Sequence, residues 1–208
     1  MSGEDPEPLA DTPESWPVEH SAERFRGAKS GMRTDWVRMP GAEGPEVVRR
    51  DFLEHPGAVG TLALDEAGRV LLIRQYRHAV AHRLWELPAG VRDQDGEPPV
   101  RTAQRELLEE AGYRAERWHA LADFFPSAGF STERIQVFLA RGLTEVPQAE
   151  IDFEWVHEEA DLPIAWLSLE DAAAAVMEGR LRNSVTVVGV LAALHAARDG
   201  FASLRRVE

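Results

Sequence analysis

The sequence predicts an α/β sandwich, in which helices pack on a mixed β-sheet, preceded by a small β-unit. Short β-like runs alternate with helical stretches along most of the chain. With 208 residues, the chain can bury one substantial core, and its 44% hydrophobic and 28% charged residues are ordinary for a globular protein. We therefore expect three parts: an acidic disordered tail at residues 1–20, a β-unit at 21–56 and the main domain at 57–208.

The first two parts are predicted from composition and turn signals. Residues 1–20 carry four prolines and many acidic residues, so they have little apolar surface to bury. Two β-like runs follow, Asp35–Met39 and Glu46–Leu53. Met39-Pro40-Gly41 between them is typical of a turn, which predicts a small β-unit.

The main domain begins near Ala58. Its apolar patterns and turn residues predict strands and helices in mixed order. The expected strands are Ala58–Leu64, Val70–Tyr76 after a turn at Asp65–Gly68, Trp118–Phe124, Arg134–Ala140 and Ile164–Leu167, with a short apolar segment at Leu84–Ala89. The expected helices are Val100–Ala111 ended by Gly112, Ser168–Glu178 with Ser168 as N-cap and Gly179 at its end, and Val185–Arg198 ended by Gly200.

Charge and composition exclude several classes of protein. The formal net charge of −13 disfavours a DNA or RNA partner, because phosphate backbones need clustered Lys and Arg. The chain has no cysteine, which excludes thiol nucleophiles and thiolate zinc sites. The longest apolar stretch, Val185–Ala197, is shorter than the roughly 20 residues that span a bilayer, and no secretory leader is visible. We expect a soluble cytoplasmic protein without a membrane partner.

An acidic helix carries the main chemical signal. Glu106, Glu109 and Glu110 occupy positions i, i+3 and i+4, which share one helix face. Like charges at this spacing destabilise a helix, whereas a hard divalent cation would turn the repulsion into coordination. A metal ion held there could bind the oxygens of a diphosphate and activate water. The alternative is a solvated helix face, with Arg105 paired to Glu109 at i+4.

The segment around this helix resembles the Nudix box. Gly90 opens it, Glu97 is the first acidic position, and seven residues later the run Arg105–Tyr113 reads R-E-L-L-E-E-A-G-Y. The pattern of fixed residues from Glu97 onward is complete, with Tyr113 in the last apolar slot. Six residues rather than the usual five separate Gly90 from Glu97, and this leaves the spacing among the helix carboxylates unchanged.

The resemblance implies a metal site and assigns its residues. In Nudix hydrolases the outer glutamates of this run are the main ligands, here Glu106 and Glu110. The carbonyl before the box glycine, here that of Ala89, also ligates. Glu109 would bind a further ion or orient water, and Arg105 would hold a glutamate. The implied cofactor is Mg²⁺, with Mn²⁺ as a substitute.

Further segments resemble ADP-ribose pyrophosphatases. They are Leu72–His78, Leu84–Gly90, Ser127–Ser131 with Glu133, and Asn183-Ser184. This likeness implies hydrolysis of ADP-ribose to AMP and ribose 5-phosphate, by a homodimer formed through the β-unit. Two alternatives stay open. One is a Nudix hydrolase of another nucleoside diphosphate derivative: a sugar nucleotide, dinucleoside polyphosphate or oxidised nucleotide. The other is a catalytically silent ligand sensor.

The same likeness suggests substrate contacts and a general base. Arg77, at the end of a predicted strand, is the first choice for gripping a phosphate. Arg50 in the β-unit and Glu133 are further candidate contacts. The base is expected on the acidic loop Glu145–Asp161, with Glu159 fitting best and Glu158 second. For each of these residues, the alternative is an ordinary solvated charge.

Overall fold

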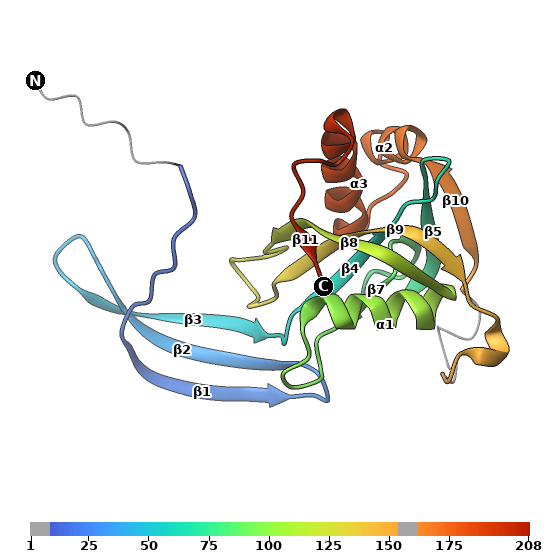
Figure 1. Ribbon diagram of the computed structural model, residues 1–208. Coiled ribbons are helices and arrows are strands. Elements are labelled where there is room, and N and C mark those ends of the chain that lie inside the picture. Colours follow the sequence, from blue (N-terminus) through green and yellow to red (C-terminus); the bar gives the residue numbers. More distant parts are fainter. Residues whose placement is uncertain (1–8, 154–161) are drawn as a thin grey trace, which may run out of the picture. The chain divides into compact units, whose positions relative to one another are not determined.

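The computed structural model describes residues 9–153 and 162–208, and its chain divides into two compact units (Figure 1). Unit 1 comprises Met1–Leu53 and unit 2 comprises Glu54–Glu208.

Unit 1 is built on a three-stranded sheet. Its strands are β1 (Val18–Arg26), β2 (Gly31–Met39) and β3 (Glu46–Glu54), in the order β1-β2-β3, with β1 antiparallel to β2. The sequence did not predict β1, which begins inside the expected disordered tail. Nearly every residue of β1 is exposed, so pairing with β2 rather than burial defines this strand.

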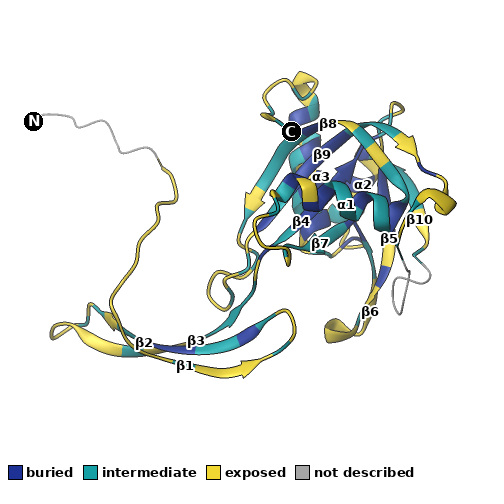
Figure 2. Cartoon of the chain, turned by 60° about the horizontal axis from the view of Figure 1, so that its bottom comes forward, coloured by how far each residue is buried: buried dark blue, intermediate teal, exposed yellow. Residues whose placement is uncertain are grey.

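The interior of unit 1 is polar. Thr34 Oγ1 accepts a hydrogen bond from Arg24 Nε at 2.9 Å and donates one to Asp51 Oδ1 at 2.5 Å. Hydrogen bonds from Thr34 and Arg49 keep the pKa of the Asp51 carboxyl below its ordinary value. Figure 2 shows how little of this unit is buried. Among residues 9–53, the buried ones are Gly31, Thr34 and Asp35.

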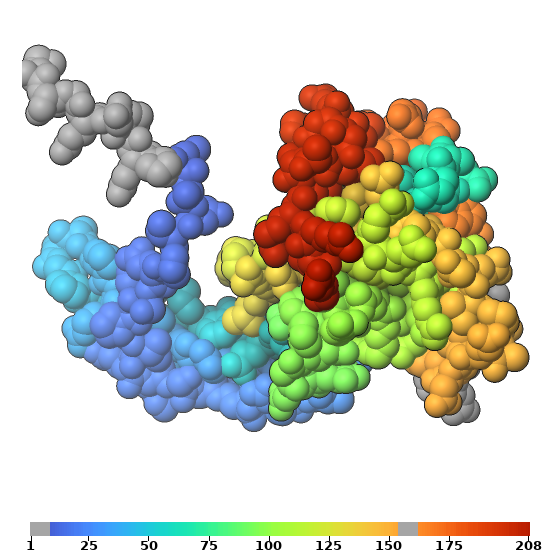
Figure 3. Space-filling model, viewed as in Figure 1, coloured from blue at the N-terminus to red at the C-terminus, as the bar shows by residue number. Residues whose placement is uncertain are grey.

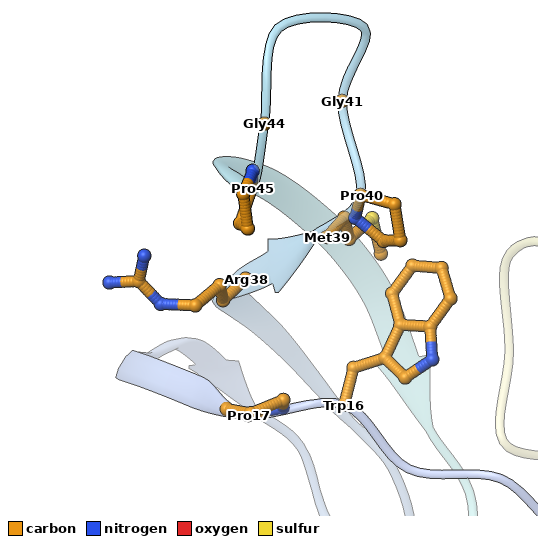
Figure 4. Close-up of a pocket in the computed structure, with 8 residues that line it drawn as sticks. All are labelled: Trp16, Pro17, Arg38, Met39, Pro40, Gly41, Gly44 and Pro45. Carbon is orange, nitrogen blue, oxygen red and sulfur yellow. The ribbon is translucent and has the colours of Figure 1, made fainter.

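A pocket of about 380 Å³ lies at one end of the same sheet, beside the turn between β2 and β3 (Figure 4). The Trp16 indole lies on the side of Met39 and Pro40, whereas the Arg38 guanidinium points away. The residues that line the pocket are Trp16, Pro17, Arg38, Met39, Pro40, Gly41, Gly44 and Pro45. The pocket walls are therefore largely proline, glycine and apolar side chains.

Unit 2 contains two sheets. One has the strand order β11-β8-β9-β4-β7 and the other has the order β10-β5-β6. The pairing of β4 with β9 is parallel and that of β8 with β9 is antiparallel, so the larger sheet is mixed. The strands are β4 (Ala58–Ala63), β5 (Arg69–Arg77), β6 (His82–Glu86), β7 (Ala89–Val91), β8 (Tyr113–Phe124), β9 (Ile135–Glu145), β10 (Ile164–Ser168) and β11 (Arg206–Val207).

Helices cover the sheets of unit 2 on both sides. In Figures 1 and 3, α1 lies on one side, and α2 and α3 lie on the other. Two buried apolar clusters match this layering: one joins α1 to β4, β5 and β9, and the other joins α2 and α3 to those same strands. The predicted α/β/α sandwich is confirmed. The helices are α1 (Pro99–Ala111), α2 (Leu169–Met177) and α3 (Ser184–Ala196), with short 3-10 turns at His78–Val80, Gln148–Glu150 and Ala197–Asp199.

The predicted end of α1 at Gly112 and the predicted N-cap of α2 at Ser168 are confirmed, whereas α3 ends at Ala196 rather than at Arg198 and a 3-10 turn follows it. Gly112 closes α1 with φ of 73°, a left-handed conformation that glycine adopts without a steric penalty. Ser168 Oγ accepts a hydrogen bond from the Asp171 N–H at 3.0 Å, which caps α2. None of the helices in the described part of the chain has the length and apolar character needed to cross a membrane.

Candidate functional site

Helix α1 places its glutamates beside strand β7. Val100, Ala103 and Leu107 are buried in the apolar cluster between α1 and the sheets. This anchoring fixes the rotation of the helix, because residues on one helical face recur every three to four positions. As a result, the acidic side chains at 106, 109 and 110 lie along the flank of α1 rather than in the apolar core.

Glu110 is joined directly to the β7 backbone. Its Oε2 accepts a hydrogen bond from the Ala89 N–H at 2.7 Å, and the residue is only 8% exposed. A buried carboxylate is costly unless hydrogen bonds or opposite charges compensate for its lost hydration. Glu110 therefore has a defined position next to Ala89. The carbonyl of Ala89 is the backbone metal ligand that the family resemblance implies.

Glu106 approaches the next residue of the same strand. A Cβ placed on Gly90 would collide with the Glu106 carboxylate, so only glycine leaves room for that side chain. The carboxylates of Glu106 and Glu110 thus meet the backbone of two consecutive residues, Gly90 and Ala89. A larger residue at position 90 would force the Glu106 side chain to move, and the φ of Gly90 is not in the left-handed region.

Arg105 connects the remaining acidic groups of the helix. Its Nη1 lies 2.8 Å from Glu106 Oε1 and 2.9 Å from Glu109 Oε2, and its Nη2 lies 3.9 Å from Glu97 Oε2. Burial alone would lower the pKa of Arg105, but the carboxylates of Glu106, Glu109 and Glu97 outweigh burial and raise it. Glu97 also accepts a hydrogen bond from Thr102 Oγ1 at 2.8 Å, so the lengthened loop still directs Glu97 toward α1.

These residues fit a hard divalent cation. Within the described residues, no group of three or more His, Asp or Glu side chains forms a ready-made metal cage. Magnesium does not require one, because it keeps several waters and is commonly held by one or two carboxylates together with substrate phosphates. Glu106 and Glu110 supply such a pair of carboxylates. They lie against the backbone of β7, where Gly90 has no Cβ to occupy the space of the Glu106 carboxylate.

Arg77 is held by a carboxylate that the sequence reasoning missed. Its Nε and Nη2 donate to the two oxygens of Glu86, with Nη2–Oε2 at 2.7 Å. Glu86 is only 1% exposed. The signal that could have found it is an acidic residue inside the apolar run Leu84–Ala89, since a buried charge needs a partner.

Glu133 and Arg50 contact other residues. Glu133 lies before β9, with its Oε1 3.7 Å from His55 Nδ1. Arg50 belongs to unit 1, where its side chain is exposed and donates to the Arg49 carbonyl at 3.1 Å. Glu158 and Glu159 lie outside the described residues. The structure therefore brings together Ala89, Glu106, Glu109, Glu110 and Arg105, and separately pairs Arg77 with Glu86.

Comparisons with known proteins show which family and relatives the chain resembles. Residues 54–186 match the family model described as the NUDIX domain. An ADP-ribose pyrophosphatase of Mycobacterium tuberculosis is 45% identical over 182 residues, which cover 88% of this chain and 84% of the relative. A CMP-5'-(N-acetyl-N-hydroxy-3-aminopropyl)phosphonate hydrolase of Streptomyces rubellomurinus is 34% identical, covering 76% of this chain and 72% of the relative.

A solved structure shares the fold. The crystal structure of an ADP compounds hydrolase superposes with a TM-score of 0.70, covering 92% of this chain and 99% of the other. The two sequences are 16% identical, so this likeness concerns the arrangement of helices and strands.

Proposed function

This chain belongs to the Nudix hydrolase family, and from that premise we propose that it hydrolyses ADP-ribose to AMP and ribose 5-phosphate. The substrate is suggested by the relative with 45% identity, whose name specifies ADP-ribose. The observation that carries the proposed chemistry is the meeting of Glu106 and Glu110 at consecutive residues of β7.

Glu106 and Glu110, with the Ala89 carbonyl, would hold the divalent cation that Nudix hydrolases generally use. We propose Mg²⁺, with Mn²⁺ as a substitute, because the donor set consists of oxygen atoms. The chemistry that such an ion supplies when bound is neutralisation of charge on phosphate oxygens and activation of a water. Glu109 would orient that water or hold a further ion.

The protein's own groups would place the diphosphate and move one proton. Arg77 would donate hydrogen bonds to phosphate oxygens, a geometry that suits the planar guanidinium. Arg105 would keep the Glu106 and Glu109 carboxylates turned toward one another. Glu159, with Glu158 as the alternative, would accept the proton of the attacking water. The water oxygen would join one phosphorus while the bond from that phosphorus to the bridging oxygen breaks.

We further propose that unit 1 joins two copies of the chain into a homodimer. This proposal is supported by the small, polar interior of unit 1. Among residues 9–53, the buried side chains are those of Thr34 and Asp35. Apolar side chains of Val18, Phe25 and Val47 remain exposed. A three-stranded sheet gains independent stability by packing an apolar face against another surface, and a second copy would provide that surface.

A second candidate is hydrolysis of a different nucleoside diphosphate derivative or a related phosphonate. The 34% identical relative named for a CMP-linked phosphonate supports this alternative. A silent ligand sensor is disfavoured because Glu106, Glu109, Glu110 and Arg105 are all present.

A substrate panel tests these possibilities. ADP-ribose, a sugar nucleotide, a dinucleoside polyphosphate and an oxidised nucleoside triphosphate would be incubated with Mg²⁺, and their products would be separated by chromatography. We expect the highest kcat/KM with ADP-ribose and formation of AMP. A higher value with another compound would transfer the proposal to that substrate. Tight binding of ADP-ribose without AMP formation would favour the sensor.

A further inference from the structure

Glu86 is the most buried carboxylate among the described residues. It is 1% exposed, compared with 5% for Asp35 and 8% for Glu110. An apolar side chain in this position would stabilise the strand without any cost of removing a charge from water. The position on β6, between Trp85 and Leu87, would suit such a residue. The presence of a carboxylate at this buried position therefore indicates that Glu86 has a specific role.

The partner of Glu86 is partly open to solvent. The Arg77 side chain is 42% exposed, whereas that of Glu86 is 2% exposed. The hydrogen bonds run from Nε to Oε1 at 3.1 Å, from Nε to Oε2 at 3.2 Å and from Nη2 to Oε2 at 2.7 Å. Glu86 thus grips the Nε edge of the guanidinium, and the edge that carries Nη1 points away from this carboxylate.

The ion pair faces the same side of the sheets as α1. Glu86 pairs across the strands with Ile73, and directly opposite residues of an antiparallel pair share one face. Ile73 lies in the apolar cluster that contains Val100, Ala103 and Leu107 of α1. Arg77 lies on that face too, because side chains two and four residues apart along a strand point the same way.

The pair is also close to the glutamates of the candidate metal site. Glu86 lies only three positions before Ala89, whose N–H donates a hydrogen bond to Glu110. Such a segment spans at most about 11 Å when fully extended. A diphosphate held at the carboxylates of α1 would therefore lie within a short reach of Arg77.

We propose that Glu86 is a positioning residue, which fixes the Arg77 guanidinium in the orientation that binds a substrate phosphate. This inference rests on the proposed function, in which Arg77 contacts the diphosphate. An arginine loses several rotatable bonds of freedom when it binds a ligand. The ion pair with Glu86 would already restrict the Arg77 side chain when the protein folds. The substrate would then bind a preorganised guanidinium.

The test compares Glu86→Gln, Arg77→Ala and the double variant. Glutamine keeps the volume of Glu86 and one acceptor oxygen but removes the charge. Loss of a charge-assisted hydrogen bond should raise the KM for ADP-ribose about 10- to 100-fold. The value of kcat should change by less than about threefold, because uniform binding is what is lost. Glu66→Gln is the matched control, since Glu66 pairs with Arg117 at 3.3 Å on the exposed surface.

The double variant distinguishes positioning from independent effects. Without Arg77, Glu86 has no guanidinium to hold, so the double variant should resemble Arg77→Ala in KM. Independent action would multiply the two single effects, and that result would overturn the proposal. An unchanged KM in Glu86→Gln would overturn it as well. If Glu86→Gln does not melt cooperatively, Glu86→Asp keeps the charge, withdraws it from Arg77 and should raise KM in the same way.

Binding without turnover separates this inference from the proposed function. Calorimetry with ADP-ribose, in the presence of a chelator, measures affinity without hydrolysis. Weaker binding by Glu86→Gln and an unchanged affinity of Glu66→Gln would support the role of Glu86. Equal affinity of wild type and Glu86→Gln would contradict it. Failure of the wild type to form AMP with Mg²⁺ would instead reject ADP-ribose hydrolysis as the function.

Discussion

The Glu110 carboxylate accepts a hydrogen bond of 2.7 Å from the backbone N–H of Ala89, across 21 residues of sequence. This bond joins helix α1 to the short strand β7. It places a nearly buried carboxylate against the peptide that precedes the box glycine.

Glu110→Gln should abolish most of the activity and preserve the fold. The amide oxygen of glutamine can still accept the Ala89 N–H, but it carries no charge to hold a divalent cation. Replacing residues that only support a metal ligand costs roughly 10- to 100-fold, so loss of a ligand should cost more. Turnover of ADP-ribose and thermal melting would be measured together, with Glu116→Gln at an exposed position of β8 as the control. Near-normal turnover would remove Glu110 from the metal site.

Gly90→Ala should weaken the binding of the metal ion specifically. The new Cβ would displace the Glu106 side chain, with a packing cost of about 1–3 kcal/mol. We expect the Mg²⁺ concentration for half-maximal activity to rise about tenfold or more. Gly189→Ala is the matched control, because its Cβ would meet the Leu87 side chain at 2.7 Å in the core. That control should lower the melting temperature and leave the Mg²⁺ dependence unaltered. The same Mg²⁺ requirement in both variants would contradict the prediction.

Asp123 should make the stability of unit 2 depend on pH in the acidic range. Its hydrogen bonds to Arg134, at 2.8 and 2.6 Å, hold the pKa of the carboxyl below the ordinary value of 3.8. The carboxylate therefore stabilises the fold at pH values above 3.8, and this contribution is lost as pH falls through the lower folded-state pKa. The free energy of unfolding, measured by denaturant titration between pH 6 and about 2.5, should decline less steeply with falling pH for Asp123→Asn than for wild type. Asp95→Asn, an exposed carboxyl, should follow the wild type.

A charge on the exposed apolar surface of unit 1 should separate the proposed dimer. Phe25 is 62% exposed and Val47 is 42% exposed. In a dimer formed through unit 1, aspartate at both positions would place unpaired charges in an apolar contact. Sedimentation equilibrium should then give the mass of one chain instead of two. Val80→Asp changes a 55% exposed valine of unit 2 and should leave the mass unaltered. A wild-type mass of one chain would exclude the dimer directly.

The sequence predicted most of unit 2 because its signals are local. Spacing alone identified α1 and its glutamates, and Ser168 marked the start of α2. The strand β1 escaped prediction because most of its residues are polar and nearly all are exposed, so only its partner β2 defines it. The contact of Arg77 with Glu86 depends on the register in which Arg77 faces His82 across β5 and β6. The periodicity of one strand shows which of its residues share a face, but it does not identify the residue that lies opposite each of them on the partner strand.

The polar interior of unit 1 affects which part of the chain dominates the signal in unfolding experiments. The denaturant m-value and the heat capacity change of unfolding both scale with the surface that becomes exposed to water, and apolar surface dominates the heat capacity. Unit 1 encloses Thr34 and Asp35 rather than a cluster of aliphatic side chains. Opening of unit 1 would therefore contribute little calorimetric signal. A urea titration or a scanning calorimetry trace will report mainly the melting of residues 54–208.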